Sequence, residues 1–219
     1  MRRYFSLLLI GGLFAACGGS EGTDVEASAA VDAPVTEMKA STVYNVDASA
    51  STLNWEGSKV TGDKHTGTMP LTDGQIMVSE GKIVGGKFSM DVRKMTNTDM
   101  PADQGGDKLI GHLKSADFFD VEKFPMAQFE ITQVQPATDT EGITHNISGN
   151  LTLKGVTKNV TIPTNVSMDG SMLKASAPAF VIDRKEWGMT YGSSSLADTA
   201  KDKAISDEVG LELMLVASK

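Results

Sequence analysis

The amino-acid sequence predicts an all-β protein, built as an antiparallel sandwich or barrel of about eight strands. From residue 42 onward, short stretches alternate apolar and polar residues with the two-residue period of a strand that buries one face. Segments that end in Asp-Gly or Glu-Gly, at 72–74, 79–81, 140–142 and 168–170, separate these stretches and favour tight turns. Short strands at regular spacing are typical of antiparallel sheets.

The expected strands follow one another along the chain and are marked by apolar residues at two-residue spacing. These residues are Leu53 and Trp55; Val84, Phe88, Met90 and Val92; Phe129 and Ile131; Ile147, Leu151 and Leu153; Val160 and Ile162; and Ile205, Val209, Leu211, Leu213, Leu215 and Ala217. The stretch at 205–217 is the clearest, because apolar side chains occupy its alternate positions and only Asp207 interrupts them.

Residues 101–121 interrupt the strand pattern. Leu109, Ile110 and Leu113 lie at intervals typical of a helix rather than of a strand. We therefore expect one or two short helices here, inserted between strands and lying across an open end of the sheet.

The first residues have the layout of a secretory signal. A basic start at residues 1–3 precedes an apolar run over 5–14, and small residues then lead to Cys17. This layout resembles a bacterial lipoprotein signal, in which the cysteine after the cleavage point is acylated. The apolar run of roughly 10 residues is too short to span a bilayer, which needs about 20. We therefore predict a lipoprotein signal peptide over residues 1–16 and lipid attachment at Cys17.

Residues 17–41 are predicted to form a flexible tether between the anchor and the folded domain. They are mostly small, polar and acidic, so they bury too little apolar surface to offset the entropy of ordering them. The folded domain is then expected over residues 42–219. An acylated chain of this kind is expected in the bacterial cell envelope, anchored to a membrane and facing the periplasm or the cell surface.

Charge and residue content argue against several function classes. The chain has a net charge of −8, and a negatively charged surface repels phosphate backbones, so nucleic acid is not an expected partner. The three histidines, His65, His112 and His145, show no spacing typical of a zinc site, so no metal is expected. The run Ser193 to Ser195 lacks the Gly-x-Ser-x-Gly context of a catalytic serine, and no catalytic residue is predicted.

Four ordered blocks of the chain carry a more specific signal. They are residues 62–67, which include His65; residues 112–129, with the run HLKSADFFDV followed by FPMAQF; residues 147–158; and residues 180–192. These blocks closely resemble the YceI-like family of secreted lipid-binding and polyisoprenoid-binding proteins, over about residues 42–217. The resemblance implies a lipocalin-like antiparallel β-barrel around an elongated apolar pocket for a long-chain amphiphile.

The resemblance also points to candidate ligand-binding residues. Tyr191 could offer a hydroxyl to a head group, and His112 and Arg184 could hold an oxygen at the pocket mouth. The alternatives are structural: Arg184 could pair with Asp183, His112 could satisfy a helix end, and the aromatic residues could be core anchors. The expected pocket residues are Phe88, His112, Phe118, Phe119, Arg184, Trp187, Met189 and Tyr191, with Trp187, Met189 and Tyr191 alternating on a strand that faces the pocket.

Three hypotheses of function follow from the sequence. The first is non-enzymatic binding, transport or sequestration of a polyisoprenoid, a quinone or a fatty-acid-like lipid in the cell envelope. The second is a structural or interaction barrel whose core is filled by its own side chains, and the third is an enzyme that modifies such a lipid. The first needs no cofactor apart from the bound lipid or quinone. Its partners would be that lipid, the membrane through acylated Cys17, and a second copy of the chain in a homodimer.

Overall fold

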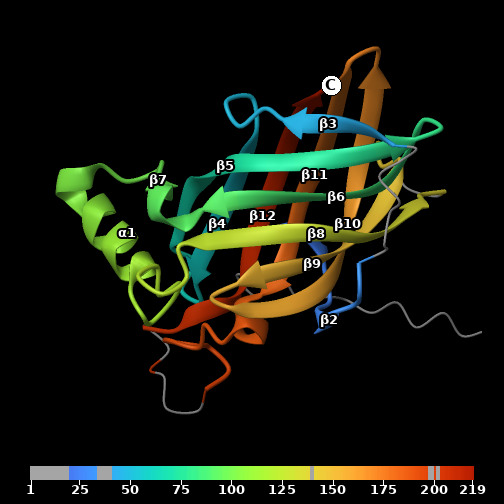
Figure 1. Ribbon diagram of the computed structural model, residues 1–219. Coiled ribbons are helices and arrows are strands. Elements are labelled where there is room, and N and C mark those ends of the chain that lie inside the picture. Colours follow the sequence, from blue (N-terminus) through green and yellow to red (C-terminus); the bar gives the residue numbers. More distant parts are fainter. Residues whose placement is uncertain (1–19, 34–40, 139–140, 197–199, 201–202) are drawn as a thin grey trace, which may run out of the picture.

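The computed structural model describes residues 20–33, 41–138, 141–196, 200 and 203–219 (Figure 1). The predicted signal peptide over residues 1–16 and the predicted acylation site Cys17 lie outside the described residues.

Eight long strands form a closed antiparallel barrel, which confirms the all-β prediction and decides between sandwich and barrel. Each strand pairs with the next along the chain, and pairing of the last strand with the first closes the barrel. The strands are β4 (Thr52–Lys59), β5 (Lys64–Ser79), β6 (Lys82–Asp91), β8 (Met126–Pro136), β9 (His145–Leu153), β10 (Val156–Asp169), β11 (Met172–Asp183) and β12 (Ile205–Ser218). A shorter strand, β3 (Thr42–Val46), lies between β5 and β12 beyond the end of β4.

Burial along the inner face of β12 shows that the barrel interior has two parts. Leu215 and Ala217 are almost completely buried in the core. Val209, Leu211 and Leu213 on the same face are only partly buried, and they border the internal cavity described below. One end of the barrel is therefore filled by side chains and the other is hollow.

The helical insertion lies across the hollow end of the barrel (Figure 1). It follows β6 through η2 (Val92–Lys94) and β7 (Thr96–Asn97), and consists of the 3-10 helix η3 (Ala102–Gln104) and the α-helix α1 (Gly106–Lys114). The predicted short helices around residues 101–121 are thus confirmed. In the described part of the chain, no helix is long and apolar enough to span a membrane.

Residues 20–31 form an N-terminal strap on the outside of the barrel, so the prediction of a flexible tether is wrong for this segment. Within the strap, β1 (Thr23–Asp24) pairs in parallel with β11, and β2 (Ser28–Ala29) pairs antiparallel with β10. Val25 between them is only 8% exposed.

The strap fills a seam in the barrel wall. Strands β10 and β11 pair with each other only through residues 165–169 and 172–176, and their remaining residues diverge. Backbone groups of the diverging edges would otherwise lack partners, and β1 and β2 supply them. The composition of residues 20–31 does not predict that the strap pairs with the barrel, because this pairing uses backbone groups that every residue type except proline provides in full.

The chain after β11 also differs from expectation. A 3-10 helix, η4 (Arg184–Trp187), follows at once, and Gly188 then turns the chain with φ 72°. The expected pocket-facing strand through Trp187, Met189 and Tyr191 therefore does not form.

Candidate functional site: an internal apolar cavity

The hollow end of the barrel encloses a cavity of about 310 Å³. All eight barrel strands contribute to its wall, and α1 covers it with Leu109 and Leu113. The lining side chains are mostly Leu, Ile, Met and Phe, so the cavity favours an apolar guest.

A pair of phenylalanines separates this cavity from a second one of about 40 Å³ deeper in the barrel. Phe88 on β6 and Phe129 on β8 line both cavities, with their ring centroids 5.4 Å apart. Phe129 lies against β9 at Gly149, where a Cβ atom would come within 2.2 Å of its ring. The glycine therefore fixes the position of one half of this partition.

Basic groups border the cavity and each has an acidic partner. His65 Nδ1 lies 3.0 Å from Asp99 Oδ2, and His112 Nε2 lies 2.9 Å from Asp117 Oδ2. Burial alone would raise the pKa of Asp99, but hydrogen bonds from His65, from the Thr66 N–H and from a neighbouring amide outweigh it and lower the pKa. Both histidines are thus held in place by carboxylates.

Arg184 lies at the same end and is only 2% exposed. Its Nε donates to the Ser206 carbonyl at 3.0 Å, and its terminal nitrogens donate to the Met189 and Ile205 carbonyls. Burial lowers the pKa of Arg184, against the opposing effect of Asp207, whose Oδ1 lies 3.5 Å from Nη2. The ion pair that the sequence suggested with Asp183 is therefore made with Asp207, and Arg184 mainly ties η4 to β12.

An aromatic cluster closes the cavity beside α1. The His112 ring stands edge-on to Phe118 and to Tyr191, with centroid distances of 5.0 Å and 4.8 Å. Phe118 also lies 5.7 Å below the Arg184 guanidinium. This cluster joins α1, the segment after it and the loop that follows η4.

The family model for the YceI-like domain matches residues 44–217. The chain belongs to the YceI-like family. A UPF0312 protein of Pseudomonas putida strain F1 is 32% identical over 118 residues, which cover 54% of this chain and 57% of the relative. A UPF0312 protein of Pseudomonas aeruginosa strain LESB58 is 45% identical over 74 residues, which cover 34% of this chain and 37% of the relative. The chain thus spans about half or less of these curated relatives.

Two solved structures share this fold. Burkholderia cenocepacia BcnA matches with a TM-score of 0.62 at 23% identity, over 79% of this chain and 99% of the other. A polyisoprenoid-binding domain from Saccharophagus degradans matches with a TM-score of 0.56 at 19% identity, over 80% of this chain and 97% of the other. At these identities the likeness shows the fold.

Six of the eight residues predicted as pocket residues line the cavity of this YceI-like barrel: Phe88, His112, Phe118, Phe119, Arg184 and Met189. Trp187 does not, because it is completely buried in the core and its Nε1 donates to the Leu151 carbonyl at 3.0 Å. Tyr191 does not either, since it is 47% exposed and packs on the outer side of His112.

Several polar wall residues are not predicted from the sequence, among them Trp55 on β4 and His65 on β5. The sequence places Trp55 on a strand and His65 in a family block, and it predicts no ligand contact for either. The alternation around Leu53 and Trp55 was the available signal, because it places both side chains on the inner face.

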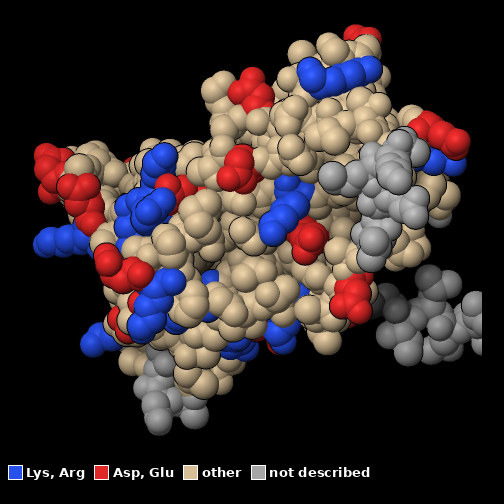
Figure 2. Space-filling model, in the orientation of Figure 1, with Lys and Arg blue, Asp and Glu red and all other residues tan. Residues whose placement is uncertain are grey.

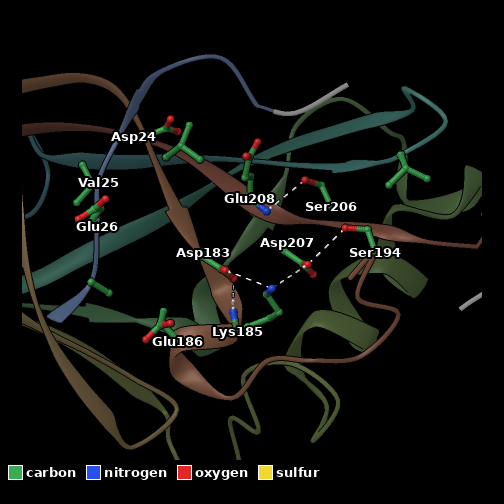
Figure 3. Close-up of a pocket in the computed structure, with 13 residues that line it drawn as sticks. Asp24, Val25, Glu26, Asp183, Lys185, Glu186, Ser194, Ser206, Asp207 and Glu208 are labelled. Atoms are coloured by element: carbon green, nitrogen blue, oxygen red, sulfur yellow. Dashed lines mark hydrogen bonds and ion pairs between the residues drawn. The ribbon is translucent and has the colours of Figure 1, made fainter. Parts of the chain in front are cut away.

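A larger groove of about 680 Å³ lies outside the barrel, between the N-terminal strap and β12 (Figure 3). Six carboxylates line it, and Lys185 bridges two of them, with Nζ 3.4 Å from Asp183 and 3.2 Å from Asp207. A hydrocarbon chain gains little in such polar surroundings, so the internal cavity is the better candidate for an amphiphile.

Charged side chains elsewhere on the surface are intermixed. Figure 2 shows acidic and basic residues side by side on one face of the barrel. Pairs such as Lys123–Asp120, at 2.8 Å, and Lys158–Glu186, at 2.7 Å, are of this type. Among the described residues, no three His, Cys, Asp or Glu side chains are grouped so as to hold a metal ion.

Proposed function

We propose that this YceI-like chain binds a long-chain amphiphile in its internal cavity and carries or sequesters it without catalysis. The candidate ligands are a polyisoprenoid, a quinone or a fatty-acid-like lipid. The observation that carries the proposal is the apolar cavity of about 310 Å³ inside a closed barrel. Burial of a hydrocarbon tail there contributes about 25 cal/mol per Å² of apolar surface removed from water.

The cavity also separates this proposal from its main rival. A barrel with a purely structural role would be filled by its own side chains, as this barrel is around Leu215 and Ala217. The hollow half is instead bordered by partly buried side chains such as Leu211, which have no protein atoms to pack against on the cavity side. The family membership and the polyisoprenoid-binding neighbour support the same reading.

We also propose that Cys17 is acylated and that the barrel works at a membrane of the bacterial cell envelope, on the periplasmic side or at the cell surface. The support is the layout of residues 1–17, and the strap then begins close to the anchor. A homodimer also stays a prediction, which size-exclusion chromatography with light scattering would test.

The test of ligand binding is organic extraction and mass spectrometry of the full chain, purified from its native host. We expect a lipid of defined mass in a near one-to-one ratio with protein. Leu211→Trp is the matched control, because the larger side chain fills the cavity from β12. That variant should lose the lipid while its circular dichroism stays that of a β-protein.

A wild-type preparation that is empty, and that takes up neither quinones, polyprenols nor fatty acids, would contradict the proposal and favour a structural barrel. A preparation in which Leu211→Trp retains the full amount of lipid would show that the ligand lies elsewhere. The external groove between the strap and β12 would then be the next candidate binding site.

A further inference from the structure

The indole N–H of Trp55 is a buried donor without an acceptor among the described residues. Trp55 is only 8% exposed and forms part of the cavity wall. The other tryptophan, Trp187, has its N–H satisfied by the Leu151 carbonyl at 3.0 Å. A buried donor left unpaired costs about 1–3 kcal/mol, so the two tryptophans differ in a way that calls for an explanation.

The position of the Trp55 ring is fixed by the neighbouring strand. Trp55 on β4 faces Gly67 on β5 in the strand register. A Cβ atom at Gly67 would lie 2.3 Å from Cζ2 and 2.5 Å from Cε2 of the indole, and 1.9 Å from the Thr96 carbonyl oxygen. Only glycine permits this arrangement, so the fold accommodates the indole edge that carries the N–H.

Trp55 lies part-way along the cavity wall. On β4, Gly57 and Lys59 follow it toward the outer end of the cavity, and Leu53 precedes it toward the partition. Leu53 pairs in register with Leu213, which lines both cavities. Trp55 therefore lies along the path of any ligand that reaches from the outer end of the cavity to the partition.

The charged and titratable side chains of the cavity wall are all basic. Among the described lining residues, the charged or titratable side chains are Lys59, His65, His112 and Arg184, and carboxylates are absent. Their acidic partners, Asp63, Asp99, Asp117 and Asp207, are not among the lining residues. The wall thus offers hydrogen-bond donors, which suit an oxygen acceptor and disfavour an ammonium group.

We propose that Trp55 Nε1–H donates a hydrogen bond to an oxygen on the head group of the bound amphiphile. The cavity then selects a chain that carries a hydroxyl, carbonyl or carboxylate oxygen over a hydrocarbon or an amine of the same length. This inference rests on the proposed function, since it assigns the recognition of the same ligand to one residue.

The test compares geranylgeraniol, the oxygen-free hydrocarbon of the same skeleton and geranylgeranylamine as probes for the delipidated full chain. Trp55→Phe removes the N–H and keeps an aromatic ring. We expect this variant to bind the alcohol about tenfold more weakly and the hydrocarbon unchanged. Trp187→Phe is the matched control, because its N–H is used within the protein, and it should leave the ratio of the two affinities unchanged.

A second measurement does not depend on the variant. The indole N–H signal of Trp55 in a proton–nitrogen NMR spectrum should move downfield when wild-type protein binds the alcohol, and much less with the hydrocarbon. The geranylgeranyl carboxylic acid in place of the alcohol shows whether an anionic head is preferred over a neutral oxygen.

The outcomes are distinct. Equal loss of affinity for alcohol and hydrocarbon in Trp55→Phe, or an indole signal that is the same with both probes, overturns the role of Trp55. Tighter binding of the amine than of the alcohol overturns the oxygen selectivity. If wild-type protein binds neither the three probes nor the geranylgeranyl carboxylic acid, the result counts against the proposed function itself.

Discussion

At the scale of single residues, the ring pair of Phe88 and Phe129 should limit how far a chain bound in the larger cavity can extend. Phe129→Ala removes one ring of the pair, whose centroids are 5.4 Å apart, and joins the cavities of about 310 Å³ and 40 Å³. We expect the bound lipids to shift toward longer chains, as measured by mass spectrometry of the extract. We also expect a loss of about 3–5 kcal/mol in the free energy of unfolding, as measured with urea.

Ile147→Ala is the control for this prediction. Ile147 lines only the smaller cavity, so its truncation costs stability, about 2–5 kcal/mol, without opening the partition. A shift to longer lipids in Ile147→Ala, or an unchanged lipid profile in Phe129→Ala, would show that the phenylalanine pair does not set the length.

Asp207 should make the protein sensitive to acid. Burial raises its pKa, but the neighbouring serine hydroxyls and Lys185, whose Nζ lies 3.2 Å from Oδ2, outweigh burial and hold the pKa below its usual value. Because the folded pKa lies below the unfolded one, the stabilisation is present above about pH 4 and is lost as pH falls through the folded pKa. Urea midpoints measured from pH 7 down to about 3 should fall less steeply in Asp207→Asn than in the wild type. Parallel pH profiles would show that Asp207 contributes nothing to acid sensitivity.

Single residues also show how much of the site the sequence could predict. Phe88, Phe118 and Met189, which the sequence suggests as pocket residues, line the cavity, although Met189 does so from the loop that follows η4 and not from the expected strand. The expected orientation of Trp187 is wrong because β11 ends at Asp183 and Trp187 lies in the 3-10 helix η4, which turns its side chain into the core. The unpaired N–H of Trp55 could not be predicted from the sequence, because the lack of an acceptor depends on the surrounding fold and not on the sequence pattern.

At the scale of elements, the N-terminal strap should contribute to stability. Val25, within the strap, is only 8% exposed and its N–H donates to the Val181 carbonyl at 2.9 Å. Val25→Asp should therefore release the strap, with a loss of about 2 kcal/mol or more in urea unfolding and faster proteolysis before residue 41. Val31→Asp is the matched control, since Val31 is 50% exposed on the same strap and should change stability by less than about 0.5 kcal/mol. Equal stability of the two variants would contradict a sealing role.

Elements with side-chain periodicity were predictable and elements held by the backbone were not. The alternation at 205–217 predicted β12, and the helix-like spacing of Leu109, Ile110 and Leu113 predicted α1. The strap has neither pattern. It is ordered because β10 and β11 diverge and leave edges to be paired, a long-range condition that no local window contains.

At the scale of the whole molecule, closure of the barrel could not be decided from periodicity. Alternating strands suit a sandwich and a barrel equally, and the difference lies in pairings such as Leu211 with Trp55 between β12 and β4. Closure is also what gives the cavity a continuous wall. The family resemblance supplied this information because it covers nearly the whole domain at once.

The docked strap changes the expected relation between anchor and barrel. A tether of about 24 flexible residues would give a root-mean-square reach of about 25–30 Å. With β1 beginning at Thr23, only residues 18–22 separate it from Cys17, and at full extension these span about 20 Å. If Cys17 is acylated, the barrel is held close to the bilayer by its β10–β11 side.

Cys17→Ser should therefore separate anchoring from ligand binding. We expect this variant to leave the membrane fraction and appear in the soluble fraction, because removal of the acyl chains removes the anchor. Its extract should contain the same lipid as the wild type, since the cavity wall is formed by the barrel strands and α1 and includes no residue of the strap. Continued sedimentation with membranes would contradict acylation at Cys17. A soluble variant that has lost its lipid would show instead that the cavity is loaded only when the anchor holds it against the bilayer.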